Sequence, residues 1–328
     1  MTSPSFPKCE LHLHLDCSLS FDVVRTLDPS VTRERFAREF VAPPKCPSLV
    51  DYLERAVKGF RLMQDERALR LVVADLASQL IADGVVYAEA RFAPHLHRLG
   101  GLTAEEVVAI VDDEAARQSA GGALDLRIIL CTLRHFSRNE SLETAHLVEQ
   151  FRGRRVVALD IAGDEAGFPI DAHLDAFRFA IEHGLHRTSH AGEARGPASV
   201  WDTLEHFQPT RIGHGVRSSE DPALVAHLAA NGIHLELCPT SNVQTNAVGT
   251  YASHPIAALF SAGVPLSVNT DCRTISDITL TREYAKLRET FGWSDRELRA
   301  CNLAAVEASF ADEATKQRLR EIMRADAV

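Results

Sequence analysis

No stretch of the 328-residue sequence is apolar over the roughly 20 residues that a membrane-spanning helix requires. The sequence also has no excess of basic residues. Its formal net charge of −10 argues against binding nucleic acid or an anionic membrane through a general electrostatic field. A local basic pocket is still compatible with this charge, but a small-molecule ligand is favoured.

The cysteines do not follow the pattern of a disulfide framework. There are seven, an odd number, and none forms a C-x-x-C pair. Residues 1–8 lack both the basic and the apolar region of a secretory signal. We therefore expect reduced thiols and a cytoplasmic protein, and the sequence leaves open whether it is a monomer or a homodimer.

Glycine-rich phosphate-binding loops are missing too, which weakens the case for a doubly wound sheet. Instead, eight short apolar segments alternate with helical ones, without a low-complexity linker. This pattern predicts a single domain over residues 1–328 with the fold of a (β/α)₈ TIM barrel. The expected strands are 10–16, 85–92, 126–133, 156–161, 187–190, 211–214, 233–237 and 264–269.

Extra helices are expected after the first strand and at the C-terminus. Residues 21–82 are predicted to be mostly helical, interrupted by prolines, with one long amphipathic segment over 51–82. This helical region as a whole could cover a site. Further helices are expected at 103–121 and 294 onward, each opened by a capping box, and at 141–151, 171–183, 222–231, 254–262 and from 279.

The most informative segment is 10–16, where His12 and His14 alternate with leucines. In a strand both would face the same side and could grip one metal ion. Imidazole nitrogens suit zinc, and a catalytic zinc normally has about three protein ligands and a water. The alternative is two buried histidines without a metal, which is costly when neither is paired.

Polar residues gather at the expected strand ends, where TIM-barrel active sites lie. They are His12, His14 and Asp16, residues 163–165, His190 and Glu193, His214, and residues 269–271.

From this set we expect one metal site in which His12, His14, His190 and Asp271 bind zinc. The zinc would lower the pKa of a bound water to about neutrality. Glu193 is the expected proton donor, and His214 would orient the water and accept its proton. Taken singly, these last two could be a surface carboxylate and a satisfied core histidine.

A second His-x-His pair, His95 and His97, follows Pro94, where the strand should have ended. No carboxylate partner is evident, so we interpret both as rim or hydrogen-bonding residues. Structural roles, at helix ends or as caps, are expected for His183, His186, Asp164 and Glu165.

Six segments resemble, in order and spacing, the adenosine deaminase family of the amidohydrolase superfamily. They are KCELHLHLD (8–16), AGDE (162–165), SHAGE (189–193), RIGHG (211–215), LCPTSN (237–242) and VNTD (268–271). RFAPH (91–95) and LRH (133–135) look like family segments as well, so the resemblance covers essentially the whole chain.

The resemblance implies hydrolytic removal of the 6-amino group of an adenine-type base, giving the inosine-type product and ammonia, with one Zn²⁺ per chain. Glu193 would protonate N1, and His214 and Asp271 would hold and deprotonate the zinc water. The implied substrate contacts are His14, Asp16 at a ribose 5′-hydroxyl, the Gly163 N–H at N3, and position 272. The chemistry agrees independently: an aromatic amidine carbon is a poor electrophile, so its attack needs both protonation of the ring nitrogen and a metal-bound hydroxide.

Cys17 and Cys272 depart from the family, which usually has glycine and aspartate, or in some members asparagine, at these positions. The second residue hydrogen-bonds N7 of the purine in the family, and a thiol is a weak donor and acceptor. Losing that partner would cost about 1–3 kcal/mol in recognition. One explanation for the two cysteines is that they are small residues that the site tolerates. The other is a 5′-modified (aminodeoxyfutalosine-like) or N6-substituted adenosine, or free adenine, although Asp16 favours a nucleoside.

Two other classes remain as alternatives. A binuclear amidohydrolase acting on an ester, lactone or cyclic amide usually has a carboxylated lysine on strand 4, and residues 156–161 contain no lysine. A non-catalytic purine-binding barrel has only the two cysteines in its favour, and Glu193 and His214 oppose it. The metal in the cell would also depend on availability.

Overall fold

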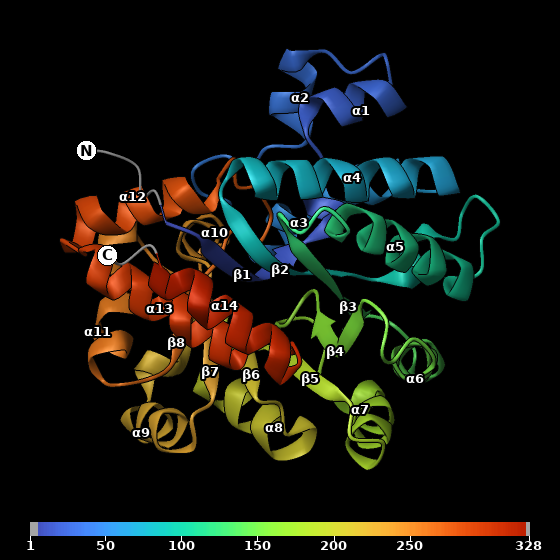
Figure 1. Ribbon diagram of the computed structural model, residues 1–328. Coiled ribbons are helices and arrows are strands. Elements are labelled where there is room, and N and C mark those ends of the chain that lie inside the picture. Colours follow the sequence, from blue (N-terminus) through green and yellow to red (C-terminus); the bar gives the residue numbers. More distant parts are fainter. Residues whose placement is uncertain (1–5, 326–328) are drawn as a thin grey trace.

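The computed structural model describes residues 6–325 and confirms the TIM barrel. Figure 1 shows the central sheet, whose eight parallel strands neighbour one another in chain order. The strands are β1 (Lys8–His14), β2 (Val85–Phe92), β3 (Asp125–Leu133), β4 (Val156–Ala162), β5 (His186–Ala191), β6 (Arg211–His214), β7 (His234–Leu237) and β8 (Leu266–Val268).

The sheet closes where β1 meets the segment that follows β8. Leu13 and Asp271 form an isolated parallel bridge. The His14 N–H donates to the Asp271 carbonyl at 2.7 Å, and the Asp271 N–H donates to the His12 carbonyl at 3.0 Å. The closure therefore fixes His12, His14 and Asp271 beside one another through backbone contacts alone.

Helices surround the sheet, and the predicted additions after strand 1 and at the C-terminus are present (Figure 1). The helices are α1 (Phe21–Leu27), α2 (Arg33–Glu39), α3 (Leu49–Phe60), α4 (Glu66–Ala82), α5 (Ala104–Ser119), α6 (Arg138–Gln150), α7 (Leu174–Glu182), α8 (Pro197–Phe207), α9 (Pro222–Asn231), α10 (Pro239–Gln244), α11 (Ile256–Ser261), α12 (Leu280–Phe291), α13 (Asp295–Ala308) and α14 (Glu313–Ala325). Within residues 6–325, no helix is both long and apolar enough to cross a bilayer.

Two helical expectations were wrong in detail. The segment 51–82 is not one helix, because Asp65 accepts a hydrogen bond from the Ala68 N–H and starts α4 separately from α3. The helix expected at 141–151 begins at Arg138, since Ser137 and Glu140 form a capping box. The capping boxes at Thr103 and Ser294 are present as predicted.

Two helices on the barrel were not expected from the sequence. Helix α8 follows β5, and its proline at Pro197 is a typical first-turn residue that could have indicated it. The short helix α10 follows β7 and begins at Pro239. Helix α10 begins two residues after β7 ends, whereas residues 192–196 separate α8 from β5.

The two ends of the barrel are closed differently. At the start of the strands, Leu11 and Tyr87 pack against Val306 and Leu319, so α13 and α14 cover this end. The charged layer inside the barrel is fully buried and consists of Glu89, Arg91, Asp160, Arg211 and Glu236. The opposite end, where the strands finish, carries the polar residues predicted for the site.

Candidate active site

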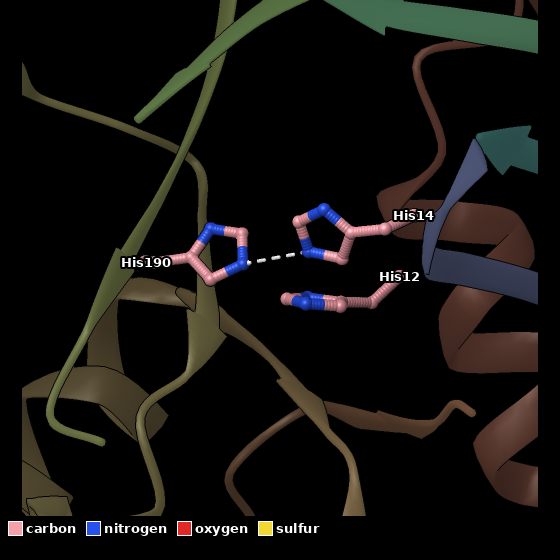
Figure 2. Close-up of side chains that lie close together, drawn as sticks. All are labelled: His12, His14 and His190. Atoms are coloured by element: carbon pink, nitrogen blue, oxygen red, sulfur yellow. Dashed lines mark hydrogen bonds between the residues drawn. The ribbon is translucent and has the colours of Figure 1, made fainter. Parts of the chain in front are cut away.

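The four residues expected to bind a metal lie together at the strand ends. Figure 2 shows His12, His14 and His190 with their rings turned toward one another. The Nε2 atoms of His14 and His190 are 3.2 Å apart. Asp271 Oδ1 lies 3.5 Å from His12 Nε2 and 3.4 Å from His14 Nε2. The structure thus brings three imidazoles from two strands and one carboxylate to a common point.

Two buried carboxylates orient these rings. His12 Nδ1 donates to Glu236 Oε2 at 2.8 Å, and His190 Nδ1 lies 3.1 Å from Asp160 Oδ2. The guanidinium of Arg91 joins both carboxylates, at 2.9 Å from Asp160 and 2.7 Å from Glu236. Carboxylates that accept the Nδ1 proton leave the Nε2 lone pair pointing to the centre, as in many metal sites.

Neither carboxylate was expected from the sequence. Each is a charged residue inside a short apolar strand, Asp160 in VVALDIA and Glu236 in HLEL. A charge in such a position must be paired to be buried, and this requirement was the available signal.

The donor set fits a metal ion. His12 Nε2 is buried and has no hydrogen-bond partner among the described residues. Burial lowers the pKa of His14 and of His190, so both imidazoles are neutral. Burial alone would raise the pKa of Asp271, but the neighbouring imidazoles of His12, His214 and His14 lower it well below its usual range. Neutral nitrogens with an ionised carboxylate suit zinc, whose tetrahedral ligand atoms lie about 3.3 Å apart.

A glycine makes room for the rings. A Cβ on Gly213 would lie 3.0 Å from His12 Cε1 and 3.2 Å from His190 Cγ. Since these contacts are tighter than ordinary van der Waals contact, position 213 has to be glycine for both rings to keep their places.

His214 and Asp271 are held in unusual backbone conformations. Their φ angles are 58° and 62°, in the left-handed region that residues other than glycine rarely adopt. Strained residues of this kind tend to cluster at functional sites. Helix α10 supports both: Ser241 donates to Asp271 Oδ2 at 2.5 Å, and Asn242 lies against His214.

A chain of hydrogen bonds sets the tautomer of His214. The Ile256 N–H donates to His254 Nδ1, so His254 Nε2–H donates to Asn242 Oδ1 at 3.1 Å. The Asn242 amide therefore donates to His214 Nδ1 at 3.0 Å, which leaves the proton of neutral His214 on Nε2. Burial lowers the pKa of His214 well below its usual value. His214 thus faces the site with an N–H donor. It can orient a water, but the expectation that it also accepts the proton of the water does not fit this tautomer, because Nε2 already carries a proton.

Glu193 is 5% exposed and lies on the other side of this donor, with Oε2 3.5 Å from His214 Nε2. Burial raises its pKa well above the usual value, and the negative charges of Asp271 and Glu165 add to the effect. The raised pKa favours the protonated carboxyl form of Glu193, the form that can give a proton.

A small cavity of about 40 Å³ lies beside these groups. Gly163, Glu193 and His14 line it, and residues Leu49, Tyr52 and Leu53 of α3 cover it. A wider hollow of about 470 Å³ adjoins it, because Leu49 and Glu193 line both. Helix α3 therefore lies over the site, as expected for this helical region.

Cys17 and Cys272 form one wall of the small cavity. Their thiols interact with each other, and Tyr52 interacts with Cys272 while it hydrogen-bonds Ser276 at 2.7 Å. All seven cysteines are buried as free thiols. The wall is therefore weakly polar.

His97 is a hydrogen-bonding residue, one of the two roles expected for this pair, because its Nδ1 bonds the Met63 carbonyl at 3.0 Å. Carboxylates that were not evident from the sequence lie near both histidines. His97 Nε2 lies 3.8 Å from Asp16 Oδ2, and His95 Nε2 lies 3.8 Å from Glu143 Oε2. These partners come from distant parts of the chain, so local sequence could not reveal them. Burial raises the pKa of Asp16 to about 6.

The expected capping role of Glu165 was also wrong. Asp164 accepts hydrogen bonds from the Ala166 and Gly167 N–H groups and forms a local turn. Glu165 instead turns toward the loop after β5, where its carboxylate accepts hydrogen bonds from several backbone N–H groups.

Comparison with known proteins agrees with this geometry. Residues 7–325 match the family model described as adenosine deaminase. The chain belongs to the adenosine deaminase family. It is therefore a hydrolytic deaminase of the adenine type, as the resemblance implied.

Relatives within this family cover nearly the whole chain. An adenosine deaminase of Mycobacteroides abscessus is 38% identical over 93% of this chain and 90% of that protein. The structure of adenine deaminase from Arthrobacter aurescens has a TM-score of 0.90 at 24% identity, covering 98% of this chain and 99% of that one. The N6-methyl-AMP deaminase from Arabidopsis thaliana has a TM-score of 0.86 at 26% identity, covering 98% and 97%.

Proposed function

We propose that this deaminase hydrolyses adenosine, or a closely related adenine nucleoside, to the inosine-type product and ammonia, with one zinc ion per chain. The observation that carries the proposal is the buried Glu193 carboxyl group, whose pKa burial raises, beside a cluster of imidazoles and Asp271 that could hold a metal ion. The similarity to an adenosine deaminase at 38% identity supports the same substrate class.

His12, His14, His190 and Asp271 are the proposed zinc ligands. A zinc ion bound there would lower the pKa of a water to about neutrality and so supply the nucleophile. Asp160 and Glu236 keep the ligand nitrogens of His190 and His12 directed at that point.

The protein groups would do the rest of the chemistry. Glu193 gives its proton to N1 of the ring, which makes C6 electrophilic, and the Gly163 N–H faces N3. The Nε2–H of His214 holds the oxygen of the attacking water, while the carboxylate of Asp271 accepts its proton. The proton that Asp271 accepted goes to the amino nitrogen as the C6–N bond breaks, and the proton of the C6 hydroxyl returns to Glu193, so water and adenosine give inosine and ammonia.

Substrate contacts are proposed for His14, Asp16, Gly163 and Cys272. Asp16 would bind the 5′-hydroxyl of the ribose, and Cys272 would lie near N7. The thiol wall made with Cys17 favours a second candidate, a 5′-modified or N6-substituted adenosine, because a thiol binds N7 weakly. Free adenine is less favoured, since Asp16 is suited to a sugar hydroxyl.

The test is ammonia release by metal-analysed protein on adenosine, 2′-deoxyadenosine, adenine, AMP, N6-methyladenosine and 5′-substituted adenosines. Fast turnover of adenosine with one zinc per chain is the expected result. Slow turnover of adenosine together with fast turnover of an N6- or 5′-substituted adenosine would favour the second candidate. Absence of turnover across the panel with zinc bound would overturn the proposal.

A further inference from the structure

One buried carboxylate binds an entire loop of the active site. Glu165, in the loop after β4, is 2% exposed. Its Oε2 accepts hydrogen bonds from three consecutive backbone N–H groups, those of Glu193, Ala194 and Arg195, at 3.0, 2.6 and 2.9 Å. Its Oε1 accepts from the Gly192 N–H at 2.7 Å and the Ser199 hydroxyl at 2.6 Å.

The two loops joined in this way hold the two groups that face the pyrimidine edge of the base in the proposed function. Gly163 lies two residues before Glu165, and Glu193 is itself one of the bonded residues. Arg134 forms a second link, because its guanidinium donates to the His190 carbonyl at 3.0 Å and to the Phe168 carbonyl at 3.3 Å. The loops after β4 and β5 are therefore tied side by side.

Glu165 is not among the residues that line either hollow at the site. Its acceptor capacity is taken up by five donors, so the side chain is committed to the loop rather than to a ligand. Hydrogen bonds to an ionised acceptor are about twice as strong as neutral ones, and here four of them act on one short loop.

We infer that Glu165 is a positioning residue that sets the spacing between the proton donor Glu193 and the backbone N–H of Gly163, and so matches the site to the N1 and N3 edge of a 6-aminopurine. This inference rests on the proposed function. A displacement of about 1 Å at a reacting group can cost about 100-fold in rate. Because Glu165 fixes the position of Glu193, its loss should slow the protonation of N1 more than it weakens the binding of the substrate.

The kinetic test compares zinc-loaded wild type with Glu165→Gln and Glu165→Asp. In Glu165→Gln an NH₂ group replaces one oxygen and meets N–H donors, so kcat for adenosine should fall about 100-fold. Glu165→Asp keeps the charge but is shorter, and about a 10-fold loss is expected. Inhibition by 1-deazaadenosine, which has carbon at position 1 and cannot use the proton of Glu193, should change less than threefold.

Asp112→Asn is the matched control. Asp112 is also a buried carboxylate that accepts backbone N–H bonds, from Arg155 at 2.7 Å and Val156 at 3.2 Å, but it lies at the opposite end of β4. Its variant should lose stability without separating adenosine turnover from 1-deazaadenosine inhibition. If the Glu165 variants lost adenosine turnover and 1-deazaadenosine inhibition to the same extent, the pocket as a whole would be disrupted and the inference overturned.

Amide hydrogen exchange gives a readout that needs no substrate. In Glu165→Gln the amides of residues 192–195 should exchange at least about 10-fold faster, whereas in Asp112→Asn those of Arg155 and Val156 should do so. Unchanged exchange at 192–195 would overturn the inference even if wild type deaminates adenosine. If the wild-type protein released no ammonia from any compound of the substrate panel, the proposed function would be rejected. The exchange experiment would then still show whether Glu165 holds the loop after β5.

Discussion

The carboxylate of Glu236 on β7 lies 2.8 Å from Nδ1 of His12 on β1, across the inside of the barrel. Both side chains are fully buried. The contact holds His12 with its unpartnered Nε2 toward His14 and His190, so the direction of a proposed zinc ligand is set by a residue 224 positions away. Asp160 does the same for His190.

Replacing either orienting carboxylate should weaken metal binding. For Glu236→Gln or Asp160→Asn we expect about a 10- to 100-fold loss of zinc affinity, because the amide is a weaker partner for Nδ1–H. Competition with a chelator measures this directly. Glu89→Gln is the control, since Glu89 is equally buried and pairs with Arg211 but contacts no histidine of the cluster. Equal zinc loss in all three variants would contradict the orienting role.

Gly213→Ala should displace the proposed ligands. The added Cβ would lie 3.0 Å from His12 and 3.2 Å from His190, so one ring has to move and zinc affinity should fall at least about 10-fold. Gly121→Ala is a suitable control, because a Cβ there meets no atom within 4 Å. Zinc content after dialysis at a fixed zinc concentration is the measurement. Full zinc occupancy of Gly213→Ala would argue against this ligand set.

Removing the proton of Glu193 should abolish most turnover without removing zinc. In Glu193→Gln the amide can still lie at N1 but cannot give a proton, so kcat should fall about 1,000-fold. Zinc analysis of the same sample separates chemistry from metal loss. Turnover near the wild-type rate would rule out Glu193 as the proton donor.

The thiol at position 272 can be tested by restoring the usual family residue. Cys272→Asp should raise kcat/KM for adenosine by about 5- to 150-fold if a missing N7 contact worth about 1–3 kcal/mol limits recognition. 7-Deazaadenosine, which has no N7, should gain nothing from the change. A large loss with adenosine would show instead that the small, weakly polar wall formed with Cys17 suits the natural substrate.

Buried neutral histidines should make the fold sensitive to mild acid. Burial lowers the pKa of His97 to about 4, and that of His234 and His254 to about 3. The unfolded chain takes up these protons near pH 6.5. Stability should therefore be complete above that pH and decrease as the pH falls toward 4. At pH 5 each histidine would cost about 2 kcal/mol of unfolding free energy.

Thermal unfolding between pH 8 and 4.5 checks this expectation. His234→Gln should flatten the acid dependence, because the group that must stay neutral in the fold is gone. His183→Gln should leave the slope unchanged, since His183 is exposed. A melting temperature independent of pH between 6.5 and 5 would contradict the argument.

Much of the fold could be predicted from local pattern. Strand β2 and strand β6 coincide with their predicted ranges, and the capping boxes at Thr103 and Ser294 start helices where expected. Errors fell where the signal was weak: the break between α3 and α4 depends on a single cap at Asp65, and α8 begins with a Gly-Pro pair that is easily read as a loop.

The site could be predicted only in part, for a physical reason. The six residues lie near or just after the end of a strand, and the barrel rule brings strand ends together: His12, His14, His190, Glu193, His214 and Asp271. Their supporting partners obey no such rule. Asn242 meets His214, and His97 meets Asp16, through side-chain contacts between segments that the sequence does not relate.

The sequence by itself determined the barrel, the family and the residues available for the chemistry, because strand alternation, helix caps and His-x-His spacing are local properties of the chain. Only the tertiary structure decided which nitrogen of His214 carries the proton, where Glu165 directs its carboxylate, and how Arg91 joins Asp160 to Glu236. These are contacts across the barrel, and buried polar groups find partners wherever the closed sheet brings them within hydrogen-bond distance.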